Sequence, residues 1–371
     1  MKALRLSLLL LLQMIAGVVF AADPVTVELL FAGDAMQHQK QLDVALSAGH
    51  NKTYDYSDCF RLIADEIKAA DYAVCNLEVP LGGGPTYSGF PNFSAPDSYA
   101  KALRDAGFDM MLTANNHCLD RGDKAARRTL QTLDRMDIDH IGTYADASER
   151  SQSVPFIKDI NGIKFGFLNY TYGTNGIEPT DGVEVSLIEP ERIEEEIKIT
   201  REAGAEILVV TMHWGVEYAL RENDTQRSLA DLLVDLGADM IIGGHPHVIQ
   251  PMEIRRNEKE DKDVLVVYSL GNLISNMGAP DTSGGALVRA VVTRDEDGKA
   301  GFRNADYDTF FVVKPVGSVR NFMVVPSWME EKIPVSQRDM WELFDRSSSQ
   351  IFDKYNVNVP RRRQRQQDQN K

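Results

Sequence analysis

Two histidines lie two residues apart in the segment IIGGHPHVIQ, which spans residues 241–250. His245 and His247 follow a pair of glycines, and the glycines directly follow an apolar run. Glycine lets a backbone turn sharply, so two imidazoles on the same side of such a loop can face different metal ions. The plainer interpretation is a polar loop that presents both rings to water, and the rest of the sequence has to decide between them.

Other side chains that bind metals or transfer protons follow further short apolar runs. The candidates are Asp34, Asn76, Glu78, Asn116, His117, His213, His245, His247 and Asn272, and they include four of the chain's 7 histidines. Singly, each has an ordinary explanation as a turn residue, a helix cap or a hydrogen-bonded group. Together they would lie beyond the carboxyl ends of parallel strands, where α/β sheets bind ligands, so we expect them to share one site.

The residue types indicate the chemistry of that site. Carboxylates, imidazoles and an amide oxygen without any thiolate suit manganese, iron or zinc, whereas calcium or magnesium alone would need fewer imidazoles. Two such ions about 3.5 to 4 Å apart can bridge a hydroxide and polarise a phosphoryl or carbonyl oxygen. His117, beside the candidate ligand Asn116, would then be free to protonate the leaving group.

The elements that must position these residues alternate along the chain. Short apolar runs are separated by segments with helical spacing, at residues 60–70, 98–106, 124–136, 190–203 and 225–236. This repetition predicts an α/β fold with a largely parallel sheet and helices packed on its faces. After Gly285, two strand-like stretches flank Asp297 and Gly298, which predicts an antiparallel hairpin, and a last helix is expected near residues 339–355. No linker or repeat interrupts the pattern, so we expect a single domain over residues 25–355.

The two ends of the chain differ from this domain. Basic residues, an apolar run and small residues at positions 1–21 predict a secretory signal cleaved after Ala21, and an uncleaved N-terminal anchor is the alternative. We therefore expect an exported protein, periplasmic or extracellular. Residues 356–371 are basic and contain no apolar residue from Arg361 on, which is typical of a disordered, solvated tail.

The overall composition excludes one class of partner and limits the role of cysteine. A formal net charge of -15 repels polyanions, which argues against nucleic-acid binding. The three cysteines are Cys59, Cys75 and Cys118; they allow at most one internal disulfide, for which Cys75 and Cys118 are the candidates, and none has zinc-ligand spacing.

The motifs also resemble a known family. The segments GDAM, CNLEVPL, TANNHCLDRG, HWGVEY, GADMIIGGHPHVIQPME and YSLGNLISN follow one another in the order seen in the CapA/PgsA family of poly-γ-glutamate capsule biosynthesis proteins. That family is similar to the calcineurin-like metallophosphoesterases. The resemblance runs from Val27 to Asn276 and implies a four-layer α/β/β/α sandwich, with the predicted hairpin and helix added at its C-terminal end, and a dinuclear metal centre.

The resemblance further implies roles for individual residues. The metal ligands would be Asp34, Glu78, Asn116, His213, His245 and His247, with Asp34 and His247 at the first ion, Glu78 bridging, and the others at the second ion. His117 would be the general acid, and Asn76 and Asn272 are expected to contact the substrate. One departure concerns the first motif, where Met36 replaces the histidine of the wider superfamily; a thioether matches these ions poorly, and His38 lies two residues further on.

Three functions follow from these patterns. The first is an exported metal-dependent hydrolase of phosphoester or related bonds that acts on a cell-surface polymer, such as poly-γ-glutamate, or on its precursor. The second, motivated by Met36, is a non-catalytic component that holds the polymer or a partner in the membrane complex for capsule synthesis and export. The third is a binding protein for a small anion, without turnover.

Overall fold

The computed structural model describes residues 25–362, so the predicted signal segment lies outside the described residues. The strands of the first sheet are β1 (Val25–Ala35), β2 (Tyr72–Leu77), β3 (Met110–Leu112), β4 (Asp139–Ile141), β13 (Asn272–Ile274), β14 (Gly284–Arg294), β15 (Ala300–Val313) and β16 (Met323–Pro326). The strands of the second sheet are β6 (Phe156–Ile160), β7 (Ile163–Thr171), β9 (Ile207–His213), β10 (Met240–Gly244), β11 (Met252–Asn257) and β12 (Lys262–Val267). A separate small pair joins β5 (Thr143–Tyr144) and β8 (Glu184–Val185).

Parallel pairing dominates the centre of both sheets. The first sheet has the order β16-β15-β14-β1-β2-β3-β4, with β13 pairing beside β1, and its strands β1 to β4 are parallel. The second has the order β11-β12-β10-β9-β7-β6, in which β7, β9, β10 and β12 are parallel. The predicted hairpin is confirmed as the antiparallel pair β14 and β15.

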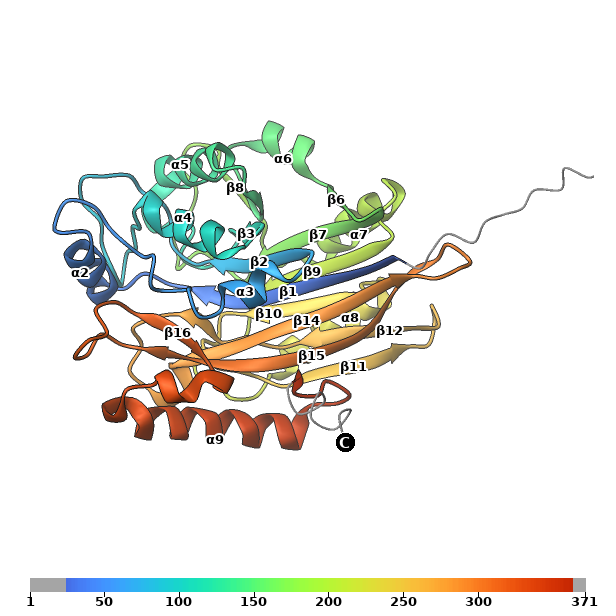
Figure 1. Ribbon diagram of the computed structural model, residues 1–371. Coiled ribbons are helices and arrows are strands. Elements are labelled where there is room, and N and C mark those ends of the chain that lie inside the picture. The colour runs from blue at the N-terminus through green and yellow to red at the C-terminus, as the bar shows by residue number, and fades with distance from the viewer. Residues whose placement is uncertain (1–24, 363–371) are drawn as a thin grey trace, which may run out of the picture.

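Helices flank the two sheets. They are α2 (Gln39–Ala48), α3 (Ala64–Lys68), α4 (Asp97–Ala106), α5 (Gly122–Arg135), α6 (Ala147–Ser153), α7 (Pro190–Glu202), α8 (Asp224–Asp235) and α9 (Arg338–Tyr355), with 3₁₀ turns at Pro280–Thr282, Ser327–Lys332 and Val335–Gln337. Apolar side chains of α3 and α4 pack on the outer face of the first sheet, and those of α7 and α8 on the outer face of the second. The four-layer α/β/β/α sandwich is therefore confirmed (Figure 1).

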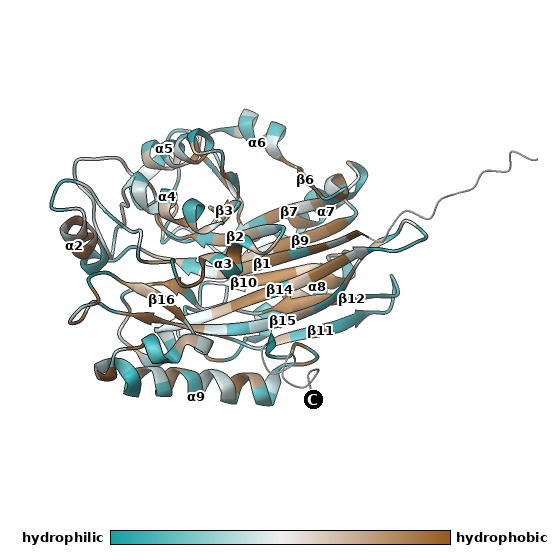
Figure 2. Cartoon of the chain, in the orientation of Figure 1, coloured by the Kyte–Doolittle hydropathy of each residue, from teal (hydrophilic) through white to brown (hydrophobic). Residues whose placement is uncertain are grey.

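The alternation of side chains along β1 shows how the layers are specified. Val27, Leu29 and Phe31 belong to the core between the two sheets, whereas Leu30 and Ala32 face the helices on the outer side. Successive residues of a strand point to opposite faces, so a strand covered on both sides is apolar at nearly every position. Figure 2 shows the result, with the hydrophobic colour concentrated on the strands of both sheets.

The last helix, α9, closes one edge of the sandwich. The ring of Phe352 lies 4.3 Å from that of Tyr307, and the ring of Phe344 lies 6.2 Å from that of Phe311, so α9 packs on β15. Figure 1 shows α9 along the lower edge of the molecule. The predicted helix near residues 339–355 is confirmed.

Three expectations are corrected. The helix expected over residues 60–70 is helical only over Ala64–Lys68. The preceding segment forms turns instead, in which an amide donates to the carbonyl three residues earlier, as the Ile63 amide does to the Phe60 carbonyl. The tail expected from residue 356 does not begin there, since Val357 pairs with β11 and the Tyr307 amide donates to the Pro360 carbonyl. Residues 363–371 lie outside the described part.

The third correction concerns the cysteines. All three are buried and free, so the disulfide hypothesised between Cys75 and Cys118 is wrong. Burial raises the pKa of the Cys118 thiol to about 12, which leaves it protonated and unreactive at neutral pH. Within residues 25–362, no helix combines the length and apolar character needed to cross a membrane.

Candidate metal centre

The carboxyl ends of strands from both sheets meet at one place. Asp34 lies at the end of β1 and pairs in register with Asn76 of β2 and Asn272 of β13. His213 ends β9 opposite Gly244, the last residue of β10. The predicted convergence of loops at strand ends is therefore what the structure shows.

Glycines allow these strand ends to approach closely. A Cβ atom on Gly33 would lie 1.9 Å from the Gly271 carbonyl oxygen, and one on Gly244 would lie 2.8 Å from Oδ1 of Asp34. The sharp turn expected at the glycines before His245 falls instead on the histidines themselves, with φ of 94° at His245 and 59° at His247. The glycines therefore allow the strand ends to lie close together, whereas the two histidines have the positive φ angles of the turn.

Two overlapping groups of ligand atoms lie at this point. The first contains Glu78, His245 and His247, and the second contains Asp34, Glu78 and His213; within each group the ligand atoms lie within 4.8 Å of one another. Glu78 is common to both, as its predicted bridging position requires. The grouping of His213 with Asp34 differs from the division implied by the resemblance, so the assignment of each ligand to one ion stays a prediction.

The Glu78 carboxylate has an unusual environment. Its side chain is completely buried, and neither oxygen has a hydrogen-bond partner among the described residues. The nearest cationic or donor atoms are Nε2 of His213 at 3.5 Å and Nε2 of His247 at 3.8 Å. Burial, and next the charge of Asp34, raise the pKa of Glu78 well above its ordinary value. A buried carboxylate without donors is costly unless a cation compensates it, and this is the environment that a metal ion would satisfy.

Two of the three imidazoles of the cluster, those of His213 and His245, are neutral as metal ligands must be. Burial lowers the pKa of His213 to about 3, so its ring is neutral at physiological pH, as a metal ligand must be. His245 is also neutral because of burial and the neighbouring rings, and its Nδ1 is buried without a partner among the described residues. Burial would lower the pKa of His247, but the charge of Glu78 and the hydrogen bond with Asp34 raise it to about 9.

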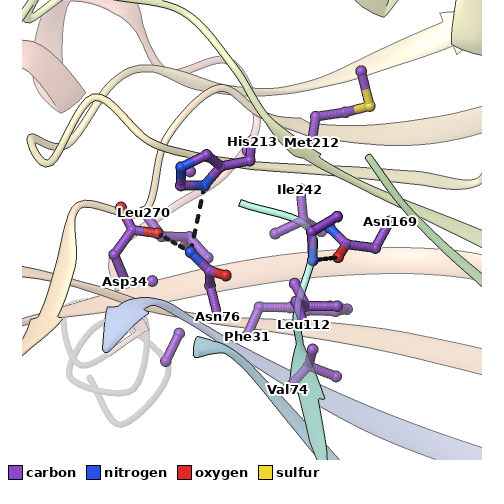
Figure 3. Close-up of a pocket in the computed structure, with 15 residues that line it drawn as sticks. Phe31, Asp34, Val74, Asn76, Leu112, Asn169, Met212, His213, Ile242 and Leu270 are labelled. Atoms are coloured by element: carbon purple, nitrogen blue, oxygen red, sulfur yellow. Dashed lines mark hydrogen bonds between the residues drawn. The ribbon is translucent and has the colours of Figure 1, made fainter. Parts of the chain in front are cut away.

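Asn76 and Asn272 lie behind the ligands. Nδ2 of Asn76 donates to Oδ1 of Asp34 at 2.8 Å and lies 3.4 Å from Nδ1 of His213 (Figure 3). Oδ1 of Asn272 lies 3.0 Å from Nδ1 of His247, while its Nδ2 donates to the carbonyls of Thr282 and His247. Both amides are buried and engaged with protein groups, so their geometry is that of residues that orient ligands. The expected contact of Asn76 and Asn272 with substrate gains no support from this arrangement.

Asn116 and His117 extend the cluster from the loop after β3. Oδ1 of Asn116 lies 2.8 Å from Nε2 of His213, which places this amide next to the ligands. Nδ1 of His117 lies 2.8 Å from Oδ2 of Asp120, and its ring packs against Phe93 with centroids 4.6 Å apart. The contact with Asp120 orients the imidazole, so Nε2 is the nitrogen left to exchange a proton.

Several residues with a place at the site were missed in the sequence. Asn115 donates to Oδ1 of Asn76 and to the Leu77 carbonyl, and Asp120 orients His117. The signal for Asp120 was its position three residues after His117, and the signal for Asn115 was the doubled asparagine. Tyr172, which follows β7 directly, was also missed although it too follows the end of a strand.

The histidine missing from the first motif is not replaced. Met36 is buried among apolar side chains of the outer layer, and its carbonyl accepts from the Tyr99 hydroxyl at 2.8 Å. Nδ1 of His38 accepts from the Asn276 amide at 3.2 Å and lies 3.2 Å from Oε1 of Gln41. His38 belongs to neither group of ligand atoms.

A small cavity lies between the sheets directly beneath the cluster. Its volume is about 20 Å³, enough for one water molecule, and its polar lining is provided by Asp34, Asn76, Asn169 and His213. Figure 3 shows these side chains beside apolar residues of both sheets.

The sequence of the chain matches the model of a known protein family. The family model described as "Bacterial capsule synthesis protein PGA_cap" matches residues 28–277, which include every candidate site residue. The chain belongs to this family of capsule synthesis proteins. The matched segment contains the second sheet, the parallel strands of the first sheet apart from the start of β1, and the candidate metal centre.

Two relatives within this family are similar to the chain. The capsule biosynthesis protein CapA of Bacillus anthracis is 31% identical over 242 residues, which cover 62% of this chain and 56% of that protein. The PGA biosynthesis protein CapA of Bacillus subtilis strain 168 is 28% identical over 284 residues, or 72% of this chain and 68% of that protein. The match therefore spans little more than half the length of the first relative.

Two solved structures have a partly similar chain course. The calcineurin-like phosphoesterase YfkN of Bacillus subtilis has a TM-score of 0.45 at 12% identity, covering 89% of this chain and 99% of that chain. The NAD nucleotidase of Haemophilus influenzae has a TM-score of 0.44 at 11% identity, covering 89% and 61%. Similarities of this size carry no argument about the chemistry of the site.

Proposed function

We propose that this protein is a metal-dependent hydrolase of phosphoester or related bonds that acts outside the cytoplasm on a bacterial cell-surface polymer or its precursor, with poly-γ-glutamate as the candidate polymer. The observation that carries the proposal is the buried Glu78 carboxylate, which has no donor among the described residues and is shared by two ligand groups. Membership of the capsule synthesis family supports the polymer. The apolar segment before residue 21 supports export.

The ligand set fits two divalent ions of manganese, iron or zinc. Asp34, Glu78, His213, His245 and His247 offer carboxylate oxygens and imidazole nitrogens without a thiolate, and His213 and His245 are neutral at physiological pH. Glu78, shared by both groups, would contact both ions. Bound ions would supply Lewis-acid activation of water and of a phosphoryl or carbonyl oxygen.

The protein's own residues account for orientation and proton transfer. Asn76 and Asn272 hold Asp34 and His247 through hydrogen bonds, which fixes the direction of both ligands. Asp120 accepts from Nδ1 of His117, so the protonated ring carries its transferable proton on Nε2. As water adds to the phosphorus or carbonyl carbon and releases a proton to solvent, the bond to the leaving oxygen or nitrogen breaks, and Nε2 of His117 gives that leaving atom its proton.

Hydrolysis by the metal-loaded protein tests this proposal. Protein loaded with manganese, iron or zinc should release product from model phosphoesters, and Glu78→Gln should abolish both metal uptake and turnover. His117→Gln should reduce turnover while leaving metal content intact. Absence of turnover on phosphoester, amide and γ-glutamyl substrates by fully loaded protein would contradict the catalytic function.

One observation favours a second function, in which the fold binds polymer or a capsule synthase and export complex without catalysis. Met36 occupies the position of a superfamily ligand, and its side chain is buried in the apolar outer layer. Complementation of a deletion strain separates the two functions. The double variant Glu78→Ala and His117→Ala would restore capsule formation if the role is non-catalytic, and would fail to restore it if hydrolysis is required.

A further inference from the structure

Two exposed tyrosines stand over the histidines of the metal centre. The Tyr172 ring lies 4.5 Å from the ring of His245 and is nearly parallel to that of His213, with centroids 6.4 Å apart. The Tyr218 ring lies 6.4 Å from that of His247. The tyrosines are 49% and 55% exposed, whereas the histidines beneath them are buried. Together with Glu217, between Val216 and Tyr218 in the sequence, they form what we call the aromatic rim (Tyr172, Glu217 and Tyr218).

The backbone holds the rim in place. The Tyr172 amide donates to the His213 carbonyl at 3.0 Å, which ties the loop after β7 to the end of β9. The Tyr218 amide donates to the Pro246 carbonyl at 2.8 Å, between the two histidines of the opening motif. Tyr218 has a φ of 66°, a conformation that costs energy for a residue with a side chain and persists where the surroundings enforce it. The rim is therefore a built part of the site.

The charge of the rim is negative. Glu217 is exposed and forms no ion pair with a cation of residues 25–362. Burial raises the pKa of both tyrosines most, and the charge of Glu217 is the second cause. The charge of Glu78 also raises the pKa of both. An anionic group at this position would meet repulsion, and a neutral apolar group would gain nothing from the carboxylate.

We propose that the aromatic rim binds a protonated amino group of the substrate, so that the hydrolase acts on phosphoesters or related compounds that carry a primary amine away from the bond that is cleaved. Partly exposed aromatic rings attract a cation, and the Glu217 carboxylate, next to Tyr218 in the sequence, adds a charged hydrogen-bond acceptor. This inference rests on the proposed function, because the other end of the substrate is held at the metal centre. It assigns a role to the Glu217–Tyr218 pair of the HWGVEY motif, which the metal chemistry does not use.

Calorimetric titration of manganese-loaded protein with three ligands tests the inference. The ligands are 6-aminohexyl phosphate, its N-acetylated form and hexyl phosphate, and binding is measured without turnover at low temperature. Wild-type protein should bind the amine about tenfold more tightly than the acetylated form, as expected for a partly exposed cation on aromatic faces with a carboxylate. Glu217→Gln should remove that difference, and Tyr172→Leu should reduce it.

A matched control removes the same charge elsewhere. Glu195 is exposed on α7 and is not part of the aromatic rim, so Glu195→Gln should keep the preference for the amine. Equal binding of the amine and its acetylated form by the wild type, or a preference that survives Glu217→Gln, would overturn the inference while leaving the hydrolase proposal standing. Failure of all three phosphates to bind would contradict the phosphoester form of the proposed function and would overturn this inference with it.

Discussion

Nε2 of His213 lies 3.5 Å from Oε1 of Glu78, and no hydrogen-bond donor reaches that carboxylate within residues 25–362. Both side chains are buried and come from different sheets, so their proximity is a product of the tertiary fold. A carboxylate in this position carries a large desolvation cost that a divalent cation would offset.

Chelation should therefore destabilise the protein. An ion present at about 100 times its dissociation constant stabilises the folded state by about 2.7 kcal/mol, and two ions would do so more strongly. Differential scanning calorimetry should show a Tm that is several degrees lower in EDTA than with added manganese. Glu78→Gln is the control, since its Tm should no longer respond to metal; an equal response in the variant would contradict the role of Glu78.

The metal-free protein should lose stability as pH rises from about 6.5 to about 9. Burial lowers and Glu78 raises the pKa of His247, with a net rise from 6.5 to about 9 in the folded state. At His247 the folded state thus binds more protons than the unfolded state in that window, so the stability contributed by His247 is fully present below pH 6.5 and is lost as pH rises through about 9. Urea unfolding across this range in EDTA measures the effect. His247→Gln should flatten the decline, and an unchanged slope would contradict the cause assigned here.

Removal of the acid should slow hydrolysis without removing the metal. His117→Gln should lower kcat by about 10²- to 10⁴-fold, the usual contribution of a general acid. Asp120→Asn should lower kcat less, because the ring remains but loses its orienting acceptor. Steady-state kinetics with parallel metal analysis measures both. The surface pair His140 and Asp134, 3.0 Å apart, offers a control: His140→Gln should leave kcat unchanged.

A methyl group at the end of β10 should disturb the centre. In Gly244→Ala the added Cβ would lie 2.8 Å from Oδ1 of Asp34, which forces either the strand or the ligand to move. We expect weaker metal binding and a loss of about 1 to 3 kcal/mol in unfolding free energy. Gly278→Ala is the control, because no atom lies within 4 Å of its added Cβ. Equal metal affinity in both variants would show that close approach at Gly244 is not required.

The sequence predicts the members of the site better than their contacts. Asp34, Glu78, His213 and His245 were identifiable because each ends or follows an apolar run, and parallel strands bring such positions to one edge. The pairing of Asp120 with His117 and the position of Tyr172 over His245 depend on loop conformations that periodicity does not encode. The distribution of strands between two sheets was likewise invisible to the pattern, since a buried parallel strand is apolar in either sheet; the family resemblance supplied it.

The positions of the hairpin and of the last helix could be predicted from local sequence. The start of α3 and the start of the C-terminal tail could not. The turn at Asp297 and Gly298 and the amphipathic α9 are specified by nearby residues. The start of α3 was placed too early because turns at Cys59 and Ile63 preserve apolar spacing without helical bonds. The expected tail from residue 356 was wrong at its start because main-chain pairing with β11 and β15 is a tertiary effect.

Metal analysis of protein purified without chelator shows whether the site holds metal ions. We expect two divalent ions of manganese, iron or zinc per wild-type chain, and a loss of bound metal in Glu78→Gln with the fold preserved by circular dichroism. Wild-type protein that contains no divalent metal and takes up none when manganese, iron or zinc is supplied would contradict this expectation.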